Sequence, residues 1–305
     1  MVRSSITIVE VGPRDGLQNE PKNIPTELKI QFINALAQSG ITHIETTSFV
    51  SPKWVPQMAD HTEVMQGITR KSGVHYSALV PNIHGMEDAI KANLQEIAVF
   101  TAASETFSKK NTNCSIKESL ERIQQVIEKA KTHHILVRGY ISCVLGCPYE
   151  GPIEMSSVVH IAEQLIAMGC YQVSLGDTIG VGTANKAQAL IKTVSQVIPL
   201  EKIAVHFHDT YAQALTNIYV SLEAGITTID SAVSGLGGCP YAPGAGGNVA
   251  TEDVVYLLQG LGITTGIDLP KLTEAGHLIC DYLKHPPRSK VSIALAGATY
   301  SPFKK

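Results

Sequence analysis

Short apolar runs rich in β-branched residues alternate along this chain with segments in which apolar residues recur every three or four positions. The apolar runs are predicted to be strands, at 6–11, 42–49, 75–80, 96–101, 135–143, 171–177, 202–208 and 227–233. The segments between them show helical periodicity, most clearly at 26–39, 116–132, 154–168, 184–197 and 211–224. Strands that alternate with helices in this way form parallel βαβ units.

Eight such units favour the α/β class and a closed TIM (β/α)8 barrel over an open, doubly wound sheet. Polar residues follow or end many of the predicted strands, and in a barrel these ends meet on one face. They are Arg14, Asp15, Glu45, Asn82, Arg138, Asp177, His206, His208 and Ser234. Residues 265–290 are predicted to form one or two extra C-terminal helices, and residues 1–305 a single domain.

The composition argues against two classes of partner. With a net charge of −3 in 305 residues, the chain offers no basic surface for nucleic acid. No run of 18 apolar residues is present that would span a membrane. The six cysteines lack metal-binding spacing and are expected to be free thiols, and the first residues lack the apolar core of a secretory signal. A cytoplasmic location is therefore expected.

His206 and His208 stand two residues apart at the end of a predicted strand, so their side chains share a face. Two imidazoles on one face are natural metal ligands, although a pair of polar strand-end histidines has the same spacing. Asp15 lies in a Gly-Pro-Arg-Asp-Gly turn after the first strand. In a barrel its carboxylate faces the same cavity, and a local ion pair with Arg14 is the alternative.

A glycine-rich segment, residues 234–248, follows the last predicted strand. It contains Cys239 and ends at Asn248. The simpler interpretation is a flexible loop, but such segments over a barrel mouth often act as lids.

These segments resemble the HMG-CoA lyase family, TIM-barrel metallolyases that share an Arg-Asp signature after the first strand. The resemblance covers essentially the whole chain and is most specific in the cysteine loop. The matching stretches are VEVGPRDGLQNE (9–20), IETTSFVSPKWVPQMAD (44–60), VRGYISCVLGCPYEG (137–151), SLGDTIGVG (174–182), HFHDTYAQAL (206–215) and SGLGGCPYAPGAGGNVATEDVVYLL (234–258). One departure is Pro21, which precedes Lys22.

The resemblance implies a retro-Claisen cleavage of 3-hydroxy-3-methylglutaryl-CoA to acetoacetate and acetyl-CoA. It implies a divalent cation, Mg²⁺ or Mn²⁺, and an acyl-CoA substrate. The implied metal ligands are Asp15, His206, His208 and Asn248. Family habit also suggests a homodimer and a place in leucine degradation or ketone-body formation.

The resemblance further implies roles for single side chains. Arg14 is expected to stabilise the enolate oxygen, and Glu45 to hold Arg14. Cys239 is expected to protonate the enolate carbon, while Asp15 or Asp177 removes the hydroxyl proton and His206 assists proton transfer. The expected substrate contacts are Arg14, Gln18, Arg138 and Asn248. The expected lid residues are Gly237, Gly238, Cys239 and Glu252.

Four alternatives stay open at this point. The chain could cleave a longer 3-hydroxy-3-alkylglutaryl-CoA, or could be a Claisen-type synthase or a pyruvate-dependent aldolase of the same superfamily. The cysteine loop argues against the synthases. A barrel that only binds acyl-CoA is disfavoured, because Arg14 and every implied metal ligand are present. The basic segment 284–290 is a weak candidate for binding nucleotide phosphates, and a solvated tail is the favoured interpretation.

Overall fold

The computed structural model describes residues 6–238 and 246–297. Its strands are β1 (Thr7–Glu10), β2 (His43–Ser48), β3 (His75–Leu79), β4 (Glu96–Ala102), β5 (Leu136–Ser142), β6 (Gln172–Asp177), β7 (Ile203–Phe207) and β8 (Thr228–Ser231). Neighbouring strands are parallel and pair in chain order, and β1 pairs with β8. The sheet is therefore a closed eight-stranded barrel, which confirms the predicted fold and excludes the open sheet.

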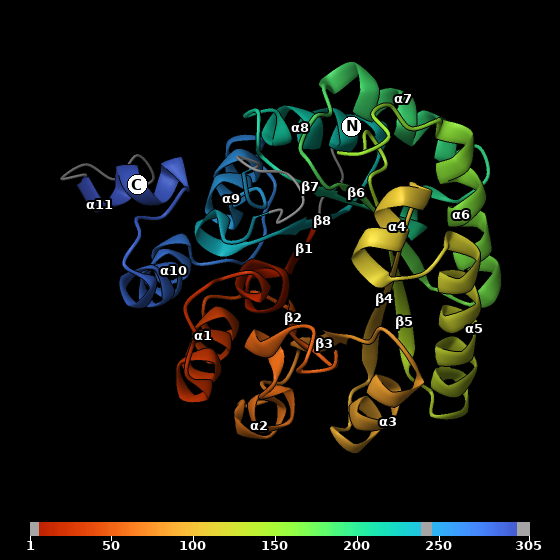
Figure 1. Cartoon of the computed structure of the whole chain (residues 1–305). Helices are drawn as coiled ribbons and strands as arrows, with labels where there is room; N and C mark the ends of the chain where they lie inside the picture. Colours follow the sequence, from red (N-terminus) through yellow and green to blue (C-terminus); the bar gives the residue numbers. More distant parts are fainter. Residues whose placement is uncertain (1–5, 239–245, 298–305) are drawn as a thin grey trace.

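Helices surround this barrel (Figure 1). They are α1 (Thr26–Gln38), α2 (His61–Gly67), α3 (Ile83–Lys91), α4 (Glu105–Thr112), α5 (Ile116–Thr132), α6 (Met155–Met168), α7 (Ala184–Val194), α8 (Ala214–Ala224), α9 (Thr251–Gly260), α10 (Leu269–Leu283) and α11 (Lys290–Gly297). The predicted helical segments coincide with α1, α5, α6, α7 and α8. No helix in the described part of the chain is both long and apolar enough to cross a membrane.

Apolar side chains between strands and helices form the main core. Ile33 and Leu36 of α1, for example, are fully buried, as are Ile97 of β4 and Val173 of β6. Strands of such a barrel are covered by helices outside and filled by side chains inside, which explains their nearly continuous apolar runs. Full burial of each large aliphatic side chain contributes roughly 1.5–3 kcal/mol.

Side-chain caps mark where several helices begin. Ser115 and Glu118 form a reciprocal capping box at the start of α5. Asn82 accepts a hydrogen bond from the Gly85 amide at α3, and Ser104 accepts one from the Phe107 amide at α4. These polar residues satisfy amides that have no partner within the helix.

The chain continues past the barrel into α10 and α11. Helix α10 packs against α1, and α11 lies at the outer side of α9 and α10, away from the barrel (Figure 1). The predicted C-terminal segment, 265–290, contains all of α10, whereas α11 begins where that segment ends. The extension is thus helical as expected but reaches further along the chain.

Candidate active site

The turn after β1 carries two charged residues to the C-terminal face of the barrel. The carbonyl of Val11 accepts hydrogen bonds from the amides of Arg14, Asp15 and Gly16, which closes a π-helical turn at Gly12–Gly16. A Cβ atom on Gly12 would lie 2.5 Å from Glu10 Oε1, so the close approach of the turn requires glycine there. Arg14 and Asp15 consequently leave the turn towards the barrel mouth.

Asp15, His206 and His208 converge at this mouth. The two Nε2 atoms are 3.3 Å apart. Oδ2 of Asp15 lies 3.8 Å from His206 Nε2 and 4.0 Å from His208 Nε2. One ligand atom from each residue fits within 4.8 Å of the others, and in the described part of the chain this is the one such group.

Asn248 joins the group from the far side of the glycine-rich segment. It forms an isolated antiparallel bridge with His208, which fixes its backbone beside β7. Its Nδ2 donates to Asp15 Oδ2 over 2.9 Å and to the Leu236 carbonyl over 3.1 Å. These two bonds orient the amide next to the three titratable side chains and leave Oδ1 as the atom that can bind a cation.

The protonation states suit metal binding. Burial and the neighbouring His206 lower the pKa of His208 to about 4, which keeps this imidazole neutral at pH 7. Burial alone would raise the pKa of Asp15, but Arg14 and the two imidazoles hold it well below its usual value. Asp230 Oδ2 lies 3.3 Å from Nδ1 of His206, an arrangement that orients a metal-binding imidazole. Two imidazoles and two oxygen donors fit Mg²⁺ or Mn²⁺.

Arg14 is held on two sides. Its Nε donates to Glu45 Oε1, and its Nη1 lies 2.5 Å from Asp15 Oδ1. The hydroxyl of Tyr140 donates to the other Glu45 oxygen over 2.8 Å. Burial alone would lower the pKa of Arg14, but the two carboxylates raise it above its usual value, so its charge is permanent. The guanidinium is thus fixed beside the candidate metal site.

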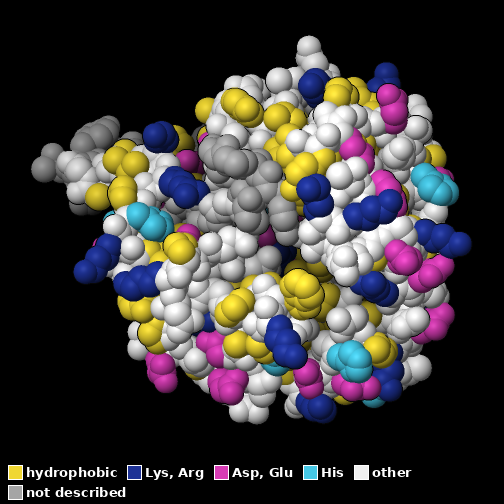
Figure 2. Space-filling view, viewed as in Figure 1, with side chains coloured by type: hydrophobic (Ala, Val, Ile, Leu, Met, Phe, Trp, Pro, Cys, Tyr) yellow, Lys and Arg dark blue, Asp and Glu magenta, His cyan; other side chains and the backbone are white. Residues whose placement is uncertain are grey.

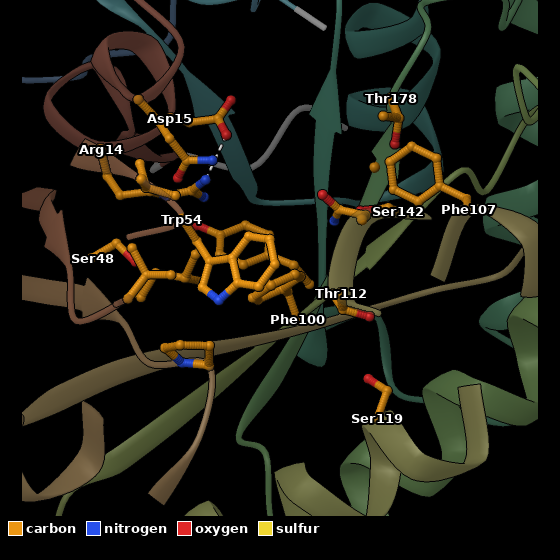
Figure 3. A pocket seen from close by; sticks show the side chains of 18 of the residues that line it. Arg14, Asp15, Ser48, Trp54, Phe100, Phe107, Thr112, Ser119, Ser142 and Thr178 are labelled. Atoms are coloured by element: carbon orange, nitrogen blue, oxygen red, sulfur yellow. Dashed lines mark hydrogen bonds and ion pairs between the residues drawn. The ribbon is translucent and has the colours of Figure 1, made fainter. Parts of the chain in front are cut away.

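A cavity of about 610 Å³ opens over these groups. Figure 2 shows the hollow near the centre of this face. Arg14, Asp15, His206 and His208 line one part of it, and Lys110 and Arg122 of α4 and α5 line another. Figure 3 shows Arg14 and Asp15 on one side, with Thr112 and Ser119 on the opposite side. This volume is within the usual range for small-molecule binding sites, so the cavity can hold a substrate as well as a cation.

Two of the expected site residues point elsewhere. Arg138 is the third residue of β5 rather than its end, and it is buried in the barrel interior, where its guanidinium donates to Asp230, Gln172 and Tyr140. Asp177 does end β6, but its carboxylate accepts hydrogen bonds from the amides of Val181 and Gly182 in the following turn. Neither side chain lines the cavity.

The other expected residues lie around the mouth. Gln18 and Gly238 line the cavity, and Gly237 precedes Gly238 in the same segment. Both carboxylate oxygens of buried Glu252 accept the amide hydrogen of Ser234, at the start of the glycine-rich segment. The predicted proton donor Cys239 falls outside the described residues.

Sequence reasoning did not single out three residues of the site. Tyr140 of β5 holds Glu45 of β2 from across the barrel. Asp230 of β8 binds Arg138 of β5 and lies beside His206 on the neighbouring strand β7. Trp54, the single tryptophan of the chain, lines the cavity although its side chain is 78% exposed. The signal that the sequence did offer was a lone tryptophan between Pro52 and Pro56, in a segment whose two prolines are typical of a loop.

Comparison with known proteins finds relatives over nearly the whole chain. A family model described as HMGL-like matches residues 5–279. The cytoplasmic 3-hydroxy-3-methylglutaryl-CoA lyase of Rattus norvegicus is 57% identical over 289 residues, covering 95% of this chain and 84% of that protein. The mitochondrial hydroxymethylglutaryl-CoA lyase of Homo sapiens is 54% identical over 289 residues, covering 95% and 89%.

A solved structure shows the same agreement in three dimensions. The crystal structure of hydroxymethylglutaryl-CoA lyase from Pseudomonas aeruginosa superposes with a TM-score of 0.95 at 55% identity, covering 97% of this chain and 98% of that one. Fold, site geometry and sequence identity lead to one conclusion: the chain belongs to the HMG-CoA lyase family.

Proposed function

We propose that the chain is a metal-dependent carbon–carbon lyase that cleaves 3-hydroxy-3-methylglutaryl-CoA to acetoacetate and acetyl-CoA. The observation that carries this proposal is the convergence of Asp15, His206 and His208 beside a fixed Arg14 in a large cavity. The family relationship supports the same reaction, because the relatives compared above are named for it.

Asp15, His206, His208 and Asn248 would hold the cation, with an oxygen from Asn248 completing the set. A bound Mg²⁺ or Mn²⁺ supplies Lewis acidity, which lowers the pKa of a hydroxyl group and orients it. Because the four residues come from the turn after β1, the end of β7 and the segment before α9, the closed barrel is what brings them together. The donors fit this role without rearrangement of the strands.

Arg14 faces the charge that the reaction creates. When the C2–C3 bond breaks, negative charge develops on the thioester oxygen as an enolate. Glu45 and Asp15 hold the guanidinium before this charge appears, and such preorganised donors are worth more in the transition state than in water. Glu45 is therefore proposed as the residue that positions Arg14.

Proton transfers require one group to accept the hydroxyl proton and another to protonate C2. Asp15 lines the cavity and Asp177 does not, so we assign the first role to Asp15, with His206 beside it to carry the proton onward. The second role stays with Cys239, as the resemblance to the family implies. Asp177 is then a residue that shapes the turn after β6.

We propose that the CoA part of the substrate extends towards α4 and α5. Lys110 and Arg122 line the part formed by α4 and α5, and their charges suit phosphate groups.

The proposal also includes a cytoplasmic location, expected from the sequence, and a homodimer, suggested by the family resemblance. The rat relative compared above is named cytoplasmic and the human one mitochondrial.

The purified protein incubated with 3-hydroxy-3-methylglutaryl-CoA and Mn²⁺ or Mg²⁺ should release acetoacetate, measured by a coupled dehydrogenase assay. A chelator should abolish release, and added metal should restore it, since the site would lose its cation. Unchanged activity in excess chelator would contradict the metal role. A longer 3-alkyl analogue run in parallel, with faster cleavage, would favour the longer-chain alternative.

Trp54 provides a second test of the same cavity. Because it is the single tryptophan and lines the cavity while largely exposed, binding of CoA should quench or shift its fluorescence. The measurement is a titration of emission against CoA concentration, with Trp54→Phe as the blank. Emission that does not change at saturating CoA would place the ligand elsewhere.

A further inference from the structure

The ends of the glycine-rich segment form what we call the loop stem, residues 234–238 and 246–248. Its first part has an unusual backbone: φ is 59° at Ser234, 67° at Gly235 and 109° at Gly237. Left-handed conformations at a non-glycine residue are unfavourable unless neighbouring groups hold them. The stem therefore depends on its hydrogen-bond partners.

These partners come from three directions. The Glu252 carboxylate accepts the Ser234 amide, and Asn248 Nδ2 donates to the Leu236 carbonyl. The third partner is Arg288, between α10 and α11. Its Nη1 donates to the Gly237 carbonyl over 2.6 Å, and its backbone amide donates to the Ser234 carbonyl over 2.9 Å.

Arg288 also touches the other half of the stem. A Cβ atom on Gly247 would lie 2.8 Å from Arg288 Nη1, 2.4 Å from the Gly237 carbonyl oxygen and 2.7 Å from the Gly235 carbonyl oxygen. Gly247 thus packs directly against the first part of the stem and against the guanidinium. Asn248, the next residue, contacts Asp15 in the metal group.

Hydrogen bonds to Asp253 hold the residues that follow Arg288 in place. Asp253, in the first turn of α9, accepts hydrogen bonds from the Ser289 hydroxyl and from the amides of Lys290 and Val291. Among the described residues Arg288 forms no ion pair with a carboxylate. Its side-chain donor is therefore used on a backbone carbonyl of the stem.

We propose that Arg288 is a positioning residue for the metal site. It binds Gly237 against Gly247, and this contact sets the position of Asn248 relative to Asp15. The proposal rests on the proposed function in assigning a cation to Asn248. The C-terminal extension, which lies outside the barrel, thereby takes part in building the active site.

The test uses three variants of the full chain: Arg288→Ala, Arg288→Lys and, as a matched control, Lys290→Ala. Lys290 is exposed and its side chain makes no hydrogen bond or ion pair among the described residues, so this control removes a nearby positive charge without removing the contact. Mn²⁺ affinity is measured by electron paramagnetic resonance. Arg288→Ala should bind Mn²⁺ about tenfold more weakly, as is common when a group that supports a ligand is lost.

The lysine variant and the control show whether Arg288 acts through its contact with Gly237 or only through its positive charge. Arg288→Lys keeps one donor and should recover part of the affinity, and Lys290→Ala should bind as the unaltered protein does. Wild-type affinity in Arg288→Ala, or an equal loss in Lys290→Ala, would overturn the proposal.

Hydrogen exchange provides a readout that does not depend on metal. In Arg288→Ala the amides of residues 234–238 and 246–248 should exchange faster than in the unaltered protein, while those of β4 and β5 keep their rates. Unchanged exchange in the stem would also overturn the proposal. If the unaltered protein binds no Mn²⁺, the proposed function loses its metal, and the exchange data still decide the role of Arg288.

Discussion

Replacing Arg14 by lysine should lower kcat by about 100- to 1,000-fold, the range seen when one preorganised donor to a developing oxyanion is removed. The guanidinium bonds Glu45 through Nε and Asp15 through Nη1 at the same time. A lysine ammonium is a single point charge and cannot keep both contacts while facing the substrate. Because the lost interaction belongs to the transition state, KM should change far less than kcat.

Steady-state kinetics with 3-hydroxy-3-methylglutaryl-CoA provide the measurement. Arg70→Lys is a suitable control, since Arg70 is exposed and binds the carbonyls of Ala92 and Asn93 on the outside of the barrel. That variant should retain normal kinetics. If Arg14→Lys turned over within a few-fold of the unaltered protein, the guanidinium could not be the group that stabilises the enolate.

The change Asp15→Asn should weaken metal binding in addition to removing the proposed proton acceptor. The Asp15 carboxylate is the one charged oxygen in the proposed ligand set and lies within 4.0 Å of both imidazole nitrogens. Its loss should weaken Mn²⁺ binding by at least about 100-fold, beyond the 10- to 100-fold range of groups that only support a ligand. Activity should be undetectable at Mn²⁺ concentrations that saturate the unaltered protein.

Isothermal titration with Mn²⁺ measures this effect directly. Asp88→Asn makes the same chemical change on α3, where Asp88 pairs with Lys91 on an exposed surface. Such surface pairs contribute little, so this control should bind metal and cleave substrate normally. Retention of tight Mn²⁺ binding in Asp15→Asn would show that the cation is held by other residues.

The fold could be predicted because each element carries its own local signal. The strands are buried on both sides, so their apolar runs are continuous, and α5 combines strong periodicity with a capping box. Helix α4 is different: it is short and largely polar, with Phe107 and Ser108 as its buried residues, so little of that pattern is present. The predicted strand 227–233 runs two residues past β8, because the chain turns into a 3-10 helix at Val233–Gly235.

The convergence of Asp15, His206 and His208 could also be predicted, because the spacing of the two histidines at the end of β7 and the position of the turn after β1 both follow from sequence. What could not be predicted is which polar residues pair across the barrel. Arg138 looked like a substrate contact, but it binds Asp230, 92 residues further along the chain. Contacts at this separation have no local pattern, and the same holds for Arg288 and Gly237.

The pairing of β1 with β8 has a consequence for how the protein assembles during synthesis. Asp15 leaves the ribosome early, but its partners near β7 and α9 emerge only when most of the chain has been made. Until then the unfinished ring has two unpaired edges, which can join with those of other chains. The proposed cation, held by Asp15 and Asn248, would fasten this seam and favour the closed ring by mass action. Scarcity of metal in the cell would therefore reduce the yield of folded protein as well as its activity.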